Sequence, residues 1–109
     1  MDTQTTKKTY ENDDGFEIIF YDKGVEIGKA CTVNFDGKPN SFLHGVEVKE
    51  QYRGNGYGSF IIKYMVDKYH IDTLYVANDN IIAIRLYEKF GFKIIQNFDE
   101  NFIIMRKTT

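Results

Sequence analysis

Three glycines within five residues make the segment after residue 48 the best candidate for a ligand-binding loop. Gly54, Gly56 and Gly58 lie between a predicted strand and a predicted helix, where few side chains cover the backbone N–H groups. Such groups, beside the positive end of a helix dipole, form a site for an anion such as a pyrophosphate. The alternative is a tight turn that needs glycine for its backbone angles. Glycine spacing alone does not separate the two.

Two familiar phosphate loops match this segment poorly. A Walker loop ends in Gly-Lys-Ser/Thr, whereas Gly58 is followed by Ser59 and Phe60. The dinucleotide fingerprint has the spacing G-x-G-x-x-G directly after a strand, but here five residues, Lys49 to Arg53, intervene and the spacing is G-x-G-x-G. Asp79 does lie about twenty residues further on, as that fingerprint requires. A chain of 109 residues nevertheless leaves no room for a full dinucleotide-binding domain.

The flanking sequence resembles the GNAT superfamily of N-acetyltransferases. The overlapping motifs Gln51-x-x-Gly54-x-Gly56 and Arg53-Gly54-x-Gly56-x-Gly58 resemble the family's pyrophosphate loop for acyl-coenzyme A. A second block at the expected distance resembles the helix that lines the thiol end of the cofactor: Asn80-x-x-Ala83-x-x-Leu86-Tyr87-Glu88-Lys89-x-Gly91-Phe92. Together the two blocks, with a strand between them, are specific. The resemblance extends over residues 42–98 and implies acetyl-CoA as the acetyl donor.

The resemblance also implies which residues contact that donor. The strand before the loop would diverge from the next parallel strand, and backbone groups of Val46 and Val48 would bind the pantetheine. Asn80 would lie near the pantetheine, with a helix cap as its alternative role. The main chain of the loop would hold the pyrophosphate through Arg53, Gly54, Asn55, Gly56, Tyr57, Gly58 and Ser59. No metal is implied.

The implied reaction requires an amine to lose a proton and a thiolate to gain one. The resemblance assigns the second role to Tyr87, which by pattern alone is an aromatic residue of a buried helical stripe. His44 is the first candidate for the base, because the ordinary pKa of histidine suits proton transfer near neutral pH. Some arylalkylamine acetyltransferases have a histidine at the corresponding position. Glu47, expected on the other sheet face, is the alternative base, and water is another.

The elements that must position these residues follow from hydrophobic periodicity. Alternating apolar residues predict strands over residues 16–21, 25–35 and 42–48, joined by turns at 22–24 and 36–40 as an antiparallel meander. A helical period predicts a helix over residues 59–69, and a short buried strand over 72–77 follows.

The second block predicts another helix. Asn78 or Asp79 would cap its start, and Gly91 would end it. Its inner stripe would consist of Ala83, Leu86, Tyr87 and Phe90. Two last strands are predicted over residues 92–96 and 101–106. The fold class is therefore α/β, with a mixed sheet and the order βββ-α-β-α-ββ, and the resemblance makes it a GNAT-like acyl-CoA N-acyltransferase fold.

One departure from the family concerns the acceptor. Members of the family have two N-terminal helices between their first and second strands that wall the acceptor site, whereas here only Asp22-Lys23-Gly24 separates the predicted strands. A protein lysine or N-terminus that brings its own wall is therefore favoured over a small amine, and a homodimer would serve the same purpose. We expect an aromatic surface to dock the acceptor, formed by Tyr10, Phe16, Tyr21 and Phe35. A non-catalytic GNAT-like module that binds coenzyme A or a protein is the alternative function.

Composition excludes several other classes of protein. The length predicts one domain over residues 16–109 after a flexible polar tail over 1–15. A net charge of −2 lacks the basic surplus of a nucleic-acid binder. The single cysteine allows no internal disulfide and no thiolate metal cage. No apolar run resembles a signal peptide or a membrane span, so we expect a cytoplasmic protein.

Overall fold

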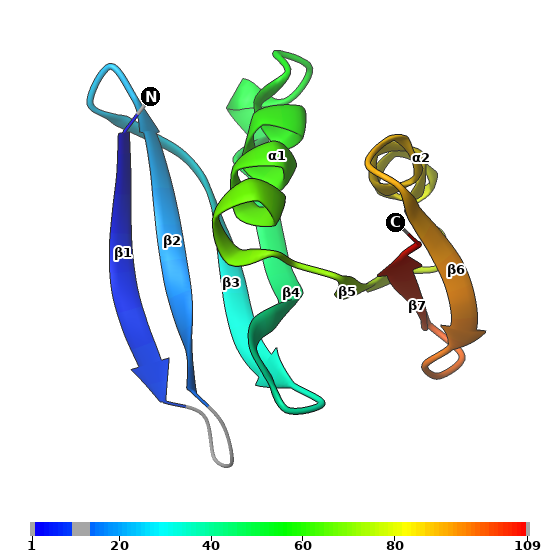
Figure 1. Ribbon diagram of the computed structural model, residues 1–109. Helices are drawn as coiled ribbons and strands as arrows, with labels where there is room; N and C mark the ends of the chain where they lie inside the picture. The colour runs from blue at the N-terminus through cyan, green and yellow to red at the C-terminus, as the bar shows by residue number, and fades with distance from the viewer. Residues whose placement is uncertain (1, 10–13, 109) are drawn as a thin grey trace.

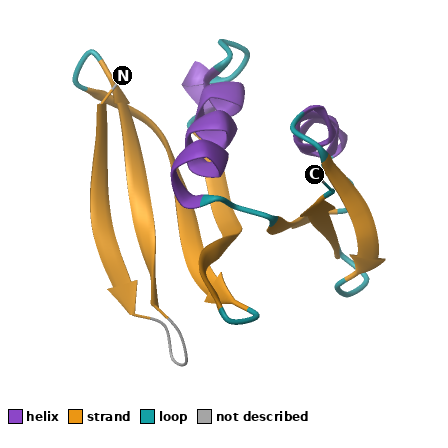
Figure 2. Cartoon of the chain, in the orientation of Figure 1, coloured by secondary structure: helices purple, strands orange, loops and turns teal. Residues whose placement is uncertain are grey.

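A computed structural model describes residues 2–9 and 14–108, the side chains of residues 8 and 9 aside. This part of the chain forms one seven-stranded sheet and two α-helices (Figures 1 and 2). The strands are β1 (Asp2–Thr9), β2 (Asp14–Asp22), β3 (Val25–Phe35), β4 (Lys38–Val48), β5 (Thr73–Ala77), β6 (Phe92–Asn97) and β7 (Phe102–Lys107). The helices are α1 (Tyr57–Tyr69) and α2 (Ile81–Lys89), and a short 3-10 helix, η1, spans Glu50–Tyr52. No helix in the described part is long and apolar enough to cross a membrane.

The sheet has the order β1-β2-β3-β4-β5-β7-β6. Strands β2, β3 and β4 form the predicted antiparallel meander, with positive φ angles at both turns, at Lys23-Gly24 and Asp36-Gly37. Strand β4 pairs with β5 in parallel, and α1 makes the crossover between them. The mixed sheet with two helices confirms the predicted fold class.

The prediction of a flexible tail over residues 1–15 is wrong for β1. Asp2–Thr9 pairs with β2 along its whole length, from Asp2 opposite Tyr21 to Thr9 opposite Asp14. The segment lacks apolar residues, which is typical of a flexible tail, but an edge strand with both faces near solvent needs no apolar alternation. Its threonines favour extended backbone, and its lysines are typical of protected sheet edges. The element order therefore begins with four strands rather than three.

Both helices begin one or two residues away from the positions that the sequence predicts. Helix α1 starts at Tyr57, two residues earlier than predicted, with Gly56 as its N-cap. Helix α2 is capped by Asn80 rather than by Asn78 or Asp79, and the Asn80 side chain accepts a hydrogen bond from the N–H of Ala83. Gly91 ends the segment with a φ of 91°, as predicted. The buried stripe of α2 contains Tyr87 and also Ile84, which the pattern did not single out.

The two helices pack on the same face of the sheet. α1 covers β3 and β4, and α2 covers β6 (Figure 1). One buried cluster joins both helices to alternate residues of the strands, among them Ile18, Leu43 and Leu74. Cross-strand register places the intervening residues, such as Cys31 and Phe42, on the opposite face. No described helix covers that second face, which we call the open face.

Candidate active site

The parallel strands β4 and β5 pair over only two residues before they separate. Phe42 lies opposite Thr73 and Leu43 opposite Leu74, and no further pair follows. Directly after the pairs, β4 carries a bulge: Cys31 of β3 lies opposite His44, but Lys29 lies opposite Glu47. Gly45 sits in this bulge with a φ of 61°. The predicted divergence of the two strands is therefore present, and it begins at the bulge.

A pocket of about 250 Å³ occupies the point of divergence. It is lined by Leu43, His44, Gly45, Val46, Tyr75, Val76, Ala77, Asn80, Tyr87 and Phe102. Four residues that the sequence singled out thus meet in one place, although up to 43 positions separate them in the chain, from 44 to 87. They are His44, Val46, Asn80 and Tyr87.

The pocket contains residues from both faces of the sheet. Val46 packs against the helix-side core, and Tyr87 comes from α2. His44, by contrast, pairs with Cys31 on the open face, and Tyr75 pairs with Ile104 of β7 there. A ligand in the pocket therefore has one end toward the helices and the other toward the open face.

Glu47 lies outside this pocket, and its expected orientation is wrong. Simple alternation places Glu47 on the opposite face from His44, because three positions separate them. The bulge at Gly45 adds one residue to β4, so both side chains lie on the open face, opposite Lys29 and Cys31 respectively. Glu47 is exposed and is not among the residues that line the pocket.

The glycine loop presents bare backbone at the start of α1. Gly54 and Gly56 both have a φ of 81°, and a Cβ at either position would meet no atom within 4 Å. No side chain caps α1, and its first turn has no acidic residue. The N–H groups at the start of a helix lack intrahelical partners, so they are available to an anion. The residues of this loop therefore fit the pyrophosphate of coenzyme A.

The side chains of Arg53, Asn55 and Tyr57 form hydrogen bonds with other parts of the chain, and the backbone at Gly54 and Gly56 stays uncovered. Arg53 donates from Nε to the carbonyl of Val48 at 3.0 Å, and Asn55 donates from Nδ2 to the carbonyl of Tyr52 at 3.1 Å. The hydroxyl of Tyr57 donates to the carboxylate of Asp22, and this hydrogen bond raises the pKa of Tyr57. Tyr57 can thus contribute its backbone, and Ser59 is exposed on the first turn of α1.

Tyr87 is a buried phenol at the helix side of the pocket. Only 6% of it is exposed, and its ring packs edge to face against Phe92. Burial raises its pKa to about 12. Tyr87 therefore keeps its proton at neutral pH, as a hydrogen-bond or proton donor must.

His44 is half-buried at the open-face side of the same pocket. Burial lowers its pKa below the ordinary value of 6.5, so the imidazole is neutral at pH 7. A neutral imidazole can accept a proton. Asn80 lines the pocket too, but its side-chain oxygen is used in the cap of α2, at 3.2 Å from the nitrogen of Ala83. Its cap role and its position in the pocket are thus both present.

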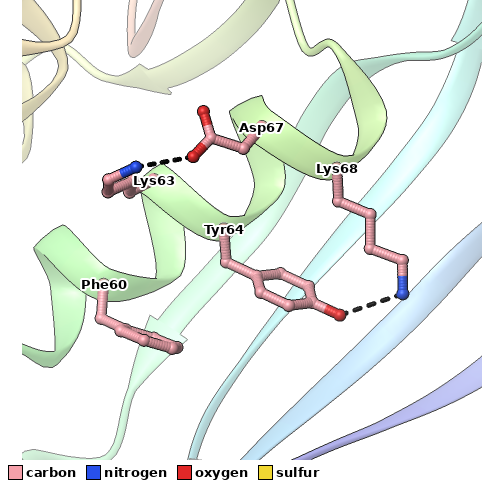
Figure 3. A pocket seen from close by; sticks show the side chains of 5 residues that line it. All are labelled: Phe60, Lys63, Tyr64, Asp67 and Lys68. Carbon is pink, nitrogen blue, oxygen red and sulfur yellow. Dashed lines mark hydrogen bonds and ion pairs between the residues drawn. The ribbon is translucent and has the colours of Figure 1, made fainter.

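A larger pocket, of about 400 Å³, lies along α1 on the side of β1 and β2, away from these residues (Figure 3). Lys63 pairs with Asp67 at 2.7 Å, and Lys68 donates to the hydroxyl of Tyr64 at 3.0 Å. The ring of Phe60 stacks on that of Tyr64. The lining contains no residue from either sequence block.

Sequence reasoning missed the open-face part of the site. Tyr75, Ala77 and Phe102 line the pocket, although neither sequence block contains them. Tyr75 and Phe102 come from β5 and β7, and their rings are 5.3 Å apart. Aromatic residues in a predicted strand are ordinary, so only the register of β5 against its neighbours reveals this position.

Comparison with known proteins agrees with the geometry. Residues 2–92 match the acetyltransferase (GNAT) family. The chain therefore belongs to the GNAT acetyltransferase family, whose acetyl donor is acetyl-CoA. No curated protein matches the sequence.

Solved structures show the shared fold at low sequence identity. An IAA acetyltransferase from Bacillus cereus is 19% identical, with a TM-score of 0.71 over 85% of this chain and 77% of that one. The ribosomal-protein-S18-alanine N-acetyltransferase from Escherichia coli is 23% identical, with a TM-score of 0.67 over 93% and 74%. PaiA N-acetyltransferase from Thermoplasma acidophilum, in complex with coenzyme A, is 24% identical, with a TM-score of 0.67 over 87% and 61%.

The family's two N-terminal helices are missing from the described elements, as predicted, but the location given for the deletion is wrong. Because β1 is the first strand, the connection between the first two strands is residues 10–13, not Asp22-Lys23-Gly24. Residues 10–13, including Tyr10, lie outside the described part of the chain.

Proposed function

We propose that this acetyltransferase transfers an acetyl group to an amine on a macromolecular acceptor, by direct attack in the pocket between β4 and β5. The observation that carries the proposal is the placement of His44 and Tyr87 in one pocket that reaches both faces of the sheet. Acetyl-CoA, held by the glycine loop, supplies the thioester that the amine attacks.

The two side chains divide the proton transfers between them. His44 accepts a proton from the acceptor amine as the new C–N bond forms, which its neutral imidazole allows. Tyr87 donates a proton to the sulfur as the C–S bond breaks, and afterwards regains one through solvent. Glu47 is exposed and outside the pocket lining, so its part in the proton transfer would require an intervening water.

The open face supports a large acceptor. Tight sites for small molecules usually enclose most of the ligand, but no described helix covers this face. A protein lysine or N-terminus brings its own surface, and a second copy of the chain is the alternative cover. The aromatic surface expected from the sequence is not one surface, because Phe16 packs on Tyr69 of α1 whereas Phe35 pairs on the open face. A cytoplasmic location is part of this proposal.

Release of free thiol from acetyl-CoA tests the proposal directly. We expect release in the presence of peptides or proteins with free amines, with kcat/KM values above those for every polyamine, amino acid or aminoglycoside tested. A higher kcat/KM for any of these small amines contradicts the choice of acceptor. Binding of acetyl-CoA without thiol release from any amine supports the alternative, a non-catalytic module.

A further inference from the structure

The open face carries a continuous row of aromatic rings across four neighbouring strands and a loop. Ring centroids lie 5.1 Å apart between Phe35 and Phe42, 5.8 Å between Phe42 and Tyr75, and 6.0 Å between Tyr75 and Phe98. Phe102 contacts Tyr75 from β7. We call these five residues the aromatic platform. Three of its rings are exposed, Phe35 at 40%, Tyr75 at 36% and Phe98 at 62%, whereas Phe42 and Phe102 are half-buried.

The aromatic platform is continuous with the pocket. Tyr75 and Phe102 belong to both, because they line the pocket and contact each other. Phe42 lies two residues before His44, on the same face of β4. An acceptor whose amine reaches His44 from the open face therefore has neighbouring atoms within reach of these rings.

The chemistry of the lining indicates what those neighbouring atoms are. None of the described residues that line the pocket is acidic, so an acceptor with several cationic groups finds no carboxylate there. Apolar side chains, by contrast, gain free energy when they cover exposed aromatic surface. The site therefore favours an amine with apolar groups beside it.

The width of the platform favours a peptide over a small amine. Adjacent strands lie about 4.8 Å apart, so the row from β3 to β7 is roughly 15 Å wide. An extended chain rises about 3.3 Å per residue, so about four or five residues span this distance. A small amine would cover only one or two of the rings.

We propose that the aromatic platform binds an extended segment of the acceptor, with aliphatic or aromatic side chains next to the amine that is acetylated. The inference rests on the proposed function, because it concerns the acceptor of the same pocket. The aromatic platform thus selects the acceptor by its apolar neighbours, and the catalytic residues act on the amine between them.

Two blocked pentapeptides test this inference: Ser-Phe-Lys-Leu-Ser and Ser-Gly-Lys-Gly-Ser, each with one free lysine amine. At saturating acetyl-CoA we expect kcat/KM for the apolar peptide to be at least tenfold higher, mainly through a lower KM. In Phe98→Ser and Tyr75→Ser variants the ratio of the two kcat/KM values should fall severalfold. Ile94→Ser is the matched control, because Ile94 is 53% exposed but pairs with Met105 on the helix side, and the ratio should not change.

Binding measurements keep this test separate from the proposed function. Calorimetric titration of both peptides into protein saturated with coenzyme A needs no turnover, and the apolar peptide should bind more tightly. Equal affinity and equal kcat/KM for the two peptides overturn the inference and leave the proposed acetyl transfer intact. Loss of thiol release with every amine, alongside selective binding of the apolar peptide, overturns the proposed function instead. A dimer in sedimentation that Phe98→Ser dissociates, with no difference between peptides, would assign the platform to a second copy.

Discussion

Tyr87 packs against the core and also lines the pocket. A variant that lacks only the hydroxyl shows whether Tyr87 also has a catalytic role. Tyr87→Phe keeps the buried ring against Phe92, so the free energy of unfolding should change little. If Tyr87 is the general acid, kcat should fall by about 10²- to 10⁴-fold, whereas the affinity for acetyl-CoA should be nearly the same as in the wild type. Steady-state kinetics and calorimetry measure both quantities. Unchanged turnover would show that Tyr87 only packs.

The raised pKa of Tyr87 predicts how kcat depends on alkaline pH. Because burial raises it to about 12, the phenol stays protonated throughout the usual assay range. An alkaline decrease in kcat below about pH 10 would therefore come from another group.

His44 should control the acidic side of the pH profile. Burial lowers its pKa, so kcat/KM should fall only below pH 6.5, as the imidazole gains a proton. His44→Gln should lower kcat/KM and remove this acidic limb. An identical limb in the variant would assign the base to Glu47 or to water.

The same residue links pH to stability. The unfolded chain protonates His44 near pH 6.5, whereas the folded chain does so only at lower pH. The free energy of unfolding therefore falls as pH decreases from 6.5 through the lowered pKa, and it is fully retained above 6.5. Urea unfolding across this range should show a steeper pH dependence in the wild type than in His44→Gln.

At the scale of elements, the glycine loop before α1 offers the sharpest test of donor binding. Gly56→Asp places a side chain and a negative charge where the loop must approach the pyrophosphate, so binding of acetyl-CoA should weaken by at least tenfold. The matched control is Gly37→Asp, at the β3–β4 turn. Both glycines have a positive φ, 81° and 75°, and a Cβ at either meets no atom within 4 Å.

Because both glycines have a positive φ and open space for a Cβ, the two substitutions strain the backbone in the same way, and both variants should remain folded. Only Gly56→Asp should impair donor binding, as measured by calorimetry. Equal affinity for acetyl-CoA in the two folded variants would contradict the assignment of this loop to the pyrophosphate.

The bulge in β4 shows where element-level prediction reaches its limit. Strand alternation correctly predicts a strand over residues 42–48, but it counts every residue as one step. Gly45 breaks that count, and its φ of 61° is accessible to glycine at little cost. A glycine inside a predicted strand often marks a bulge, so Gly45 indicates one. The sequence does not show, however, which side chains the bulge turns to the other face.

At the scale of the whole molecule, the donor should stabilise the entire fold. Strands β4 and β5 pair over only two residues, and the proposed donor site lies where they diverge. A ligand at about 100 times its Kd adds roughly 2.7 kcal/mol to the free energy of unfolding. For a domain of this size the Tm should rise by on the order of 10 °C.

Thermal unfolding with acetyl-CoA and with free coenzyme A measures this effect. Gly37→Asp should keep the increase in Tm, and Gly56→Asp should lose most of it. No increase in the wild type at millimolar acetyl-CoA would argue against a donor site in this chain.

The sequence by itself determined the local features: two helices, the hairpin turns, the glycine loop before α1 and the family resemblance in the blocks around Gly56 and Tyr87. These depend on neighbours a few residues apart, which periodicity and spacing report directly. Tertiary structure alone decided that Asp2–Thr9 is an edge strand, because a strand with two solvated faces has no apolar pattern. It also decided that Gly45 turns Glu47 to the side of His44, and that Tyr75 and Phe98 form one surface. These relations depend on pairing between distant strands, and one residue of register reverses the face on which every side chain lies.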